Sequence, residues 1–94
     1  PRHVVLENIA VQNTSIHGMN IDDGGSYDTP AGPLILRNIR IRNAGTGGNV
    51  DCLKMSGVDQ FYIDQSEFSN CNAGETIDMV GCHNGIVTRS YFHD

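Results

Sequence analysis

The feature of this sequence that most constrains its fold is an internal repeat. The segment LENIAVQN at residues 6–13 returns as LRNIRIRN at 36–43, and two further copies lie at 63–70 and 87–94. The copies begin at Leu6, Leu36, Ile63 and Val87, so the period shortens along the chain. A repeat period of a few tens of residues is typical of solenoids, in which each repeat is one structural unit that packs against its neighbours.

A second repeated block lies between the copies of the first. Residues 19–25 align with 51–57, and these align in turn with 75–81. Both blocks alternate apolar and polar residues, and Gly, Asn, Asp or Ser separates them. Each repeat therefore contains three short strands, and no segment has the spacing of an amphipathic helix.

Three strands in each repeat correspond to one coil of a parallel β-helix, whose coils pair strand on strand at about 4.8 Å. The sequence therefore predicts an all-β fold, a right-handed parallel β-helix, since parallel crossovers are almost always right-handed. Residues 1–94 are expected to form one segment of about three and a half coils. The expected coil boundaries are 4–33, 34–60, 61–84 and 85–94.

The alternation also identifies the expected core. Apolar residues that recur at the same place in each repeat should stack in columns inside the coils. Asn8 and Asn38 should occupy a sharp corner, because asparagine tolerates left-handed backbone angles. The expected columns are Leu6, Leu36, Ile63 and Val87; Val11, Ile41, Phe68 and Phe92; and Ile21, Leu53 and Ile77, with Met55 and Met79 beside the last.

Composition and the ends of the repeat pattern restrict the possible partners. The net charge of −5 argues against nucleic acid, and no apolar run approaches the roughly 20 residues of a membrane span. The three cysteines are expected to be small buried apolar residues. The first residue is Pro1 and the last repeat stops at Asp94, so we expect a fragment whose parent chain continues with further coils at both ends.

The order V/I-x-x-N-x-x-V/I-x-N, followed by G-x-x-I-D and a glycine turn, resembles the right-handed parallel β-helix superfamily of pectate lyases, polygalacturonases and related carbohydrate-active proteins. The stretch DCLKMSG at residues 51–57 is similar to a polygalacturonase signature, although Val50 replaces its first aspartate. The resemblance implies a secreted or cell-surface protein that acts on polysaccharide. For calcium-dependent lyases it implies an acidic cluster with a lysine or arginine base on one sheet.

The second block contains the expected site. Its alignment places Asp22, Lys54 and Asp78 in one outward-facing column, with further ionisable residues at the strand ends. Calcium prefers several oxygen ligands, and Lys54 is the expected base of a β-elimination from uronic-acid-containing polysaccharide. The expected roles are catalytic for Lys54, Asp78 and His83; substrate-binding for Asp59, Glu75 and Arg89; and metal-binding for Asp22, Asp23 and Asp51.

Three other interpretations of the same residues remain open. Asp22, Lys54 and Asp78 could form only a ladder of exposed ion pairs, each of which stabilises the fold little. The solenoid could bind glycans without cleaving them, as a binding, adhesin or structural module. A glycoside hydrolase could use Asp22 and Asp78, since two coils separate them by roughly 9 to 10 Å, within the range of inverting carboxyl pairs.

Overall fold

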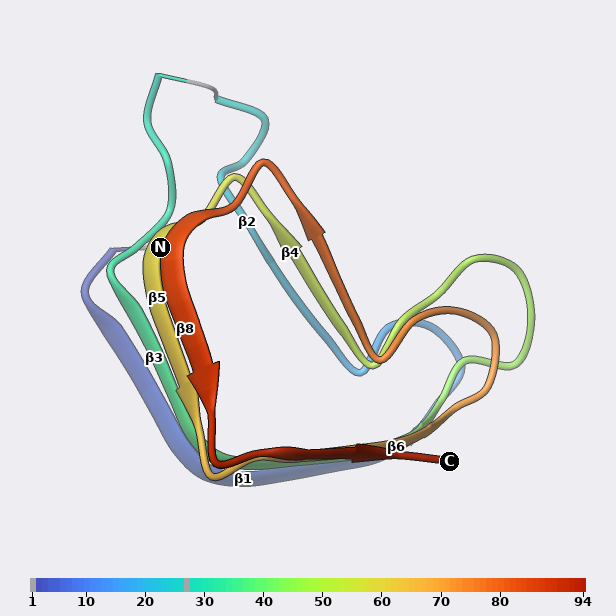
Figure 1. Ribbon diagram of the computed structural model, residues 1–94. Helices are drawn as coiled ribbons and strands as arrows, with labels where there is room; N and C mark the ends of the chain where they lie inside the picture. Colours follow the sequence, from blue (N-terminus) through green and yellow to red (C-terminus); the bar gives the residue numbers. More distant parts are fainter. Residues whose placement is uncertain (1, 27) are drawn as a thin grey trace.

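The computed structural model describes residues 2–26 and 28–94, which form a parallel β-solenoid of about three turns with no helix. Viewed along its axis, the chain runs counterclockwise as it advances toward the viewer, so the winding is right-handed (Figure 1). The predicted fold class is confirmed. The strands are β1 Val4–Thr14, β2 Met19–Asp22, β3 Leu34–Ala44, β4 Leu53–Ser56, β5 Asp59–Asp64, β6 Glu67–Cys71, β7 Ile77–Val80, β8 His83–Thr88 and β9 Tyr91–His93.

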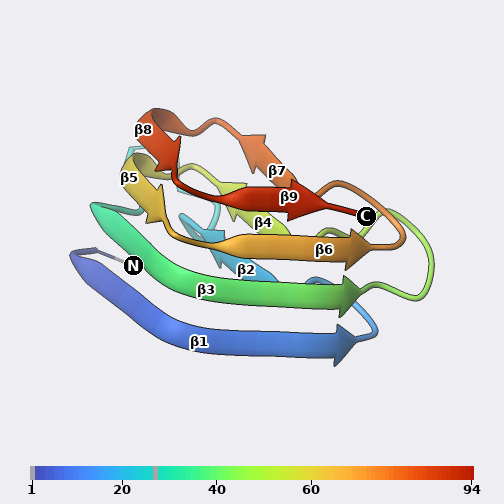
Figure 2. The same ribbon diagram turned by 60° about the horizontal axis from the view of Figure 1, so that its bottom comes forward.

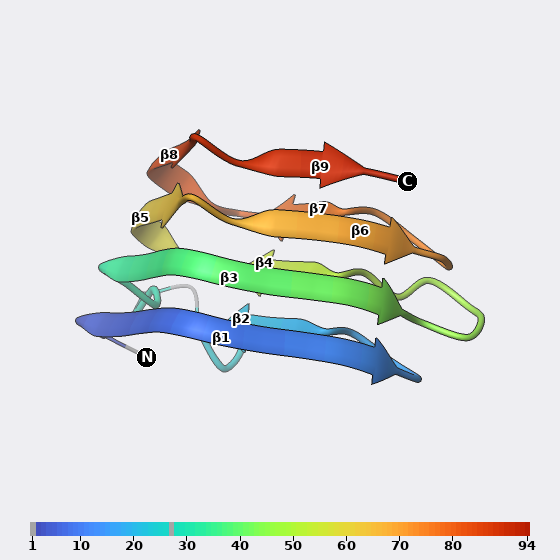
Figure 3. The ribbon, with the colours of Figure 1, turned by 90° about the horizontal axis from the view of Figure 1, so that it is seen from below.

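Each coil has three sides, here called walls (Figures 1 and 2). The first wall consists of the N-terminal halves of β1 and β3 together with β5 and β8. The second wall consists of the C-terminal halves of β1 and β3 together with β6 and β9. The stacking of β1, β3, β6 and β9 is clearest from below (Figure 3). The third wall is the separate sheet β2-β4-β7.

The corner between the first and second walls recurs at one left-handed residue in each coil. These residues are Asn8, Asn38, Gln65 and Arg89, with φ between 47° and 60°. The Asn38 amide donates a hydrogen bond of 2.7 Å to the Asn8 side-chain oxygen, which confirms the predicted asparagine corner. The left-handed conformation is least costly for glycine and asparagine among common residues, and it turns the chain sharply without ending the ladder.

The pairing of the first and second walls matches the predicted register. Leu6 lies beside Leu36, Leu36 beside Ile63, and Ile63 beside Val87. The second column, from Val11 to Phe92, is also in the predicted register.

The third wall departs from the predicted register between its first two strands. Met19, not Ile21, pairs with Leu53, so β2 is displaced along β4 from the position that the repeat predicts. The sequence alignment matches the glycines that follow the two strands. In the structure, however, the first coil leaves the wall at Asp23 into a long loop, and Gly24 and Gly25 belong to that loop. The pairing of β4 with β7 keeps the predicted register, with Leu53 beside Ile77.

The core is closed in the middle coils and open at the last one. Leu36, Ile63 and Phe68 are fully buried, whereas Val87 and Phe92 in the same columns are 38% and 44% exposed. The ring of Phe68 stacks on that of Phe92 at 5.4 Å. Apolar burial therefore depends on a neighbouring coil, as in other solenoids.

The cysteines differ from the prediction. Cys52 and Cys71 form a disulfide between the third wall and the end of β6, because the turn that joins the second and third walls brings their Cα atoms to 5.4 Å. Cys82 is a half-buried thiol. Among the described residues, no helix is long and apolar enough to cross a membrane.

Candidate functional site

The corrected register changes which residues share the outer face of the third wall. Asn20, and not Asp22, lies beside Lys54, which in turn lies beside Asp78. Asp22 is at the far end of β2, opposite Ser56, and its carboxylate accepts a hydrogen bond of 2.8 Å from the Gly24 amide. The predicted column of Asp22, Lys54 and Asp78 is therefore wrong, and so is the hydrolase pair that it would have supplied.

Lys54 and Asp78 do form the predicted neighbouring pair. The Lys54 ammonium donates a hydrogen bond to the Asp78 carboxylate across β4 and β7. Both side chains are about one quarter exposed. The hydrogen bond to Asp78 raises the pKa of Lys54 above its ordinary value, so the lysine is protonated at neutral pH.

Asp51 lies just before β4 and is only 1% exposed. Its carboxylate accepts a hydrogen bond of 2.8 Å from the backbone amide of Glu75 in the next coil. Gly74 makes this approach possible, since a Cβ there would lie 2.3 Å from the Val50 carbonyl oxygen and 2.5 Å from Asp51 Oδ1. The turn before β7 is thus built closely around the Asp51 carboxylate.

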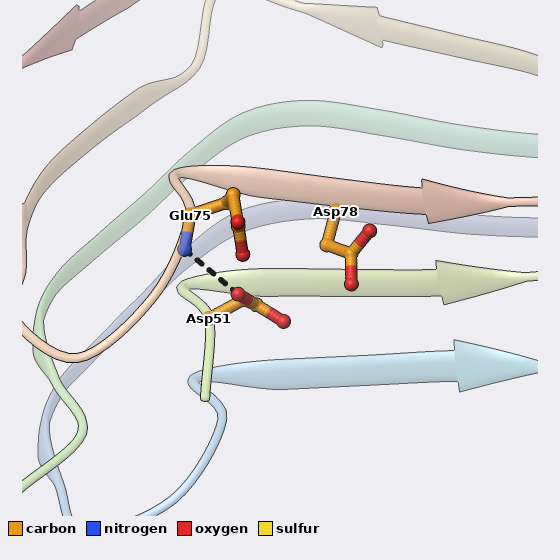
Figure 4. Close-up of side chains that lie close together, drawn as sticks. All are labelled: Asp51, Glu75 and Asp78. Carbon is orange, nitrogen blue, oxygen red and sulfur yellow. Dashed lines mark hydrogen bonds between the residues drawn. The ribbon is translucent and has the colours of Figure 1, made fainter. Parts of the chain in front are cut away.

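Asp51, Glu75 and Asp78 bring their carboxylates together from two adjacent coils (Figure 4). One oxygen of each lies within 4.8 Å of the others, and we call this group the carboxylate cluster. A hydrogen bond with the Asp51 carboxyl, together with the negative charge of that group, raises the pKa of Glu75. The two carboxyls therefore favour either a shared proton or a bound cation between them.

His17 supports the same cluster and was not predicted. Its Nδ1 accepts a hydrogen bond of 2.9 Å from the Asp51 backbone amide. A ring that accepts at Nδ1 carries its hydrogen on Nε2. Sequence spacing gave no signal for this contact, because His17 lies in the turn between β1 and β2, one coil before Asp51.

The opposite end of the third wall contains a cavity of about 570 Å³. It brings together three of the predicted site residues, Asp23, Asp59 and His83, with the unpredicted Asn84. The Asn84 amide donates a hydrogen bond of 2.7 Å to Asp59. The remaining lining residues are Gly25, Pro30, Ser56, Gly57, Val80 and Gly81.

The predicted metal ligands are therefore divided between the two ends of the wall. Asp51 is in the carboxylate cluster, whereas Asp22 and Asp23 lie at the far end, where each accepts a hydrogen bond from a glycine amide of the long loop. Within residues 2–26 and 28–94, the carboxylate cluster is the one group of three or more potential ligands close enough to hold a metal ion.

Arg89 lies away from both ends of the third wall. It occupies the corner of the last coil and forms two hydrogen bonds with the buried Asp64 carboxylate, which hold the pKa of Asp64 below its ordinary value. The Arg89 guanidinium, which was predicted to bind substrate, is thus already paired with the Asp64 carboxylate of the fold.

Comparisons with protein families, with curated proteins and with solved structures find no match to this chain.

Proposed function

We propose that this β-helix is a secreted or cell-surface protein that binds uronic-acid-containing polysaccharide along its third wall and cleaves it by β-elimination. The observation that carries the proposal is the carboxylate cluster with Lys54 beside it, on the outer face of a parallel β-helix. A disulfide between Cys52 and Cys71 supports an oxidising location, because such bonds persist mainly outside the cytosol.

The chemistry of the carboxylate cluster suits calcium. Three carboxylates offer the hard oxygen ligands that calcium prefers, and one oxygen of each lies within 4.8 Å of the others. Asp51, Glu75 and Asp78 would hold the ion. When bound, it would supply the positive charge that a uronate carboxylate needs beside a protein of net charge −5.

Lys54 is the proposed base. It would remove the proton from the carbon next to the uronate carboxylate, and the C–H electron pair would form the new double bond. The β carbon–oxygen bond would break, and the leaving sugar oxygen would take a proton from solvent. Lys54 must first release its own proton to solvent, so its hydrogen bond to Asp78 has to weaken once the cluster is neutralised.

A second candidate function is calcium-dependent glycan binding without cleavage. The ion pair between Lys54 and Asp78 favours it, because a lysine held in its charged form is a poor base. The two functions share the same wall and differ only in whether Lys54 loses its proton.

The test measures formation of unsaturated, ultraviolet-absorbing products from polygalacturonate and alginate, with and without calcium. Wild type should form product only with calcium, and Lys54→Ala should bind substrate but form none. Arg37→Ala is the matched control, since Arg37 is also a partly exposed cation with a carboxylate partner, Glu7, but on another wall. Calcium-dependent binding without product would support the second function. The absence of both binding and product would refute both functions.

A further inference from the structure

We propose that the cavity at the far end of the third wall binds a neutral, hydroxyl-rich sugar unit of the polysaccharide, next to the uronate at the carboxylate cluster. The inference rests on the proposed function and adds a substrate class to it. The volume of the cavity, about 570 Å³, lies within the range of small-molecule pockets.

The polar groups of the cavity are suited to hydroxyls. Asp59 and Asn84 are joined by one hydrogen bond, which orients both side chains and leaves the second carboxylate oxygen and the amide oxygen as acceptors. His83 adds an exposed imidazole at the start of β8. Carboxylate, amide and imidazole groups together offer the mixed donors and acceptors that vicinal hydroxyls require.

The shape of the cavity also depends on a glycine. A Cβ at Gly57 would lie 2.1 Å from Asp23 Oδ2, so only glycine lets this carboxylate lie against the turn after β4. Pro30 and Val80 supply apolar surface beside the polar groups, and Val80 is 54% exposed. An apolar surface with a few oriented polar groups is the usual composition of a small-molecule site.

The charge of the lining argues against an anionic ligand. Among the described lining residues there are two aspartates and neither lysine nor arginine. A shared metal ion is also disfavoured, because Asp23, Asp59 and His83 do not form a group with converging ligand atoms. A neutral ligand that donates hydrogen bonds matches the acceptor oxygens that Asp59 and Asn84 leave free.

The cavity and the carboxylate cluster lie along the same strands. Ser56 lines the cavity and is two residues from Lys54 on β4, about 7 Å along the strand. Val80 and Asp78 have the same relation on β7. A single glycan chain lying along the wall could therefore contact both places, and a polymer containing both uronate and neutral sugars would fit better than a pure polyuronate.

The experiment follows backbone amide signals of the isotopically labelled full chain by NMR. The probes are the neutral tetrasaccharides of glucose, mannose and galactose, each added without calcium. At least one should saturably shift the amides of Gly57, Gly81 and His83. Asp59→Ala should weaken that binding at least about tenfold, the loss expected for one good hydrogen-bonding group, while Glu7→Ala on the first wall leaves it unchanged.

Asn84→Gly is a second variant that removes the amide without straining the backbone, since Asn84 has a φ of 57° that glycine adopts freely. If no neutral probe shifts these amides, or if both variants bind as wild type does, the inference is wrong. The proposed function is tested separately in the same sample, by tetragalacturonate with calcium and the Glu75 amide signal. Either result can therefore fail without the other.

Discussion

Substitution of Gly74 by alanine should dismantle the carboxylate cluster while leaving the solenoid folded. The backbone at Gly74 does not have the positive φ that disfavours side chains, so alanine is conformationally acceptable there. The added Cβ would nevertheless lie 2.3 Å from the Val50 carbonyl oxygen and 2.5 Å from Asp51 Oδ1. Both are far inside van der Waals contact, so the turn that carries Glu75 has to move away from Asp51.

The cost of Gly74→Ala can be estimated from two contributions. Overpacking against a backbone atom typically costs about 1–3 kcal/mol. Lengthening the hydrogen bond of 2.8 Å from the Glu75 amide to the Asp51 carboxylate removes part of a charge-assisted bond, which contributes about 1.5–3 kcal/mol. We expect a loss of about 2–4 kcal/mol in the free energy of unfolding, large against the roughly 5–15 kcal/mol of a typical domain.

The assay combines urea unfolding with calorimetric calcium titration. Gly74→Ala should lower stability by the stated amount and weaken calcium binding at least about tenfold, as expected when one charged ligand is displaced. Gly47→Ala is the matched control, because Gly47 is also exposed in a turn but a Cβ there meets nothing within 4 Å. Its stability should stay within about 0.5 kcal/mol of wild type. Equal stability and equal calcium affinity in the two variants would refute this account of the cluster.

Three further predictions concern the fold. Arg89 lowers the pKa of Asp64, so the stabilisation that this ion pair gives the fold is complete above the ordinary aspartate pKa of about 4 and is lost as the pH falls through the lowered value. The unfolding midpoints of wild type and Arg89→Gln should therefore differ at neutral pH and converge in acid. Reduction of the disulfide, which closes a loop with a sequence separation of 19, should lower the unfolding free energy by about 3 kcal/mol, and an unchanged urea midpoint would contradict it. Phe68→Ala should lower the free energy of unfolding by about 3–5 kcal/mol and Phe92→Ala by only about 1–2 kcal/mol, because the Phe92 ring is 44% exposed. Equal losses of stability in thermal unfolding would show that the last coil is covered.

The fold was largely predictable because a solenoid repeats its constraints. Each coil places an apolar residue over its counterpart, so the columns that contain Leu36 and Phe68 followed directly from the repeat. The asparagine corner was predictable for the same reason. The disulfide was not, since Cys52 and Cys71 belong to different positions of the repeat and meet only when the turn between two walls is known.

The candidate site was only partly predictable because its residues lie where the repeat is irregular. Lys54 and Asp78 were paired correctly because both lie within strands. Asp22 was assigned to the wrong register because the glycines of a loop insertion look like the glycine of a turn, and the alignment of the repeats could not distinguish them. Asp51, Glu75 and His17 lie just outside the strands, where side-chain direction depends on turn geometry and not on alternation.

The lengths of the connections between walls give a physical reason for the position of the carboxylate cluster. The turn that carries Glu75, between the end of β6 and the start of β7, is shorter than the turn between β3 and β4 in the preceding coil. A short connection has little freedom, and here it is fixed further by the close approach of Gly74 to Val50. The close approach of Gly74 to Val50 thus keeps the Asp51 and Glu75 carboxylates together in spite of their repulsion. The long loop after β2 instead provides room, and it is there that the cavity lies.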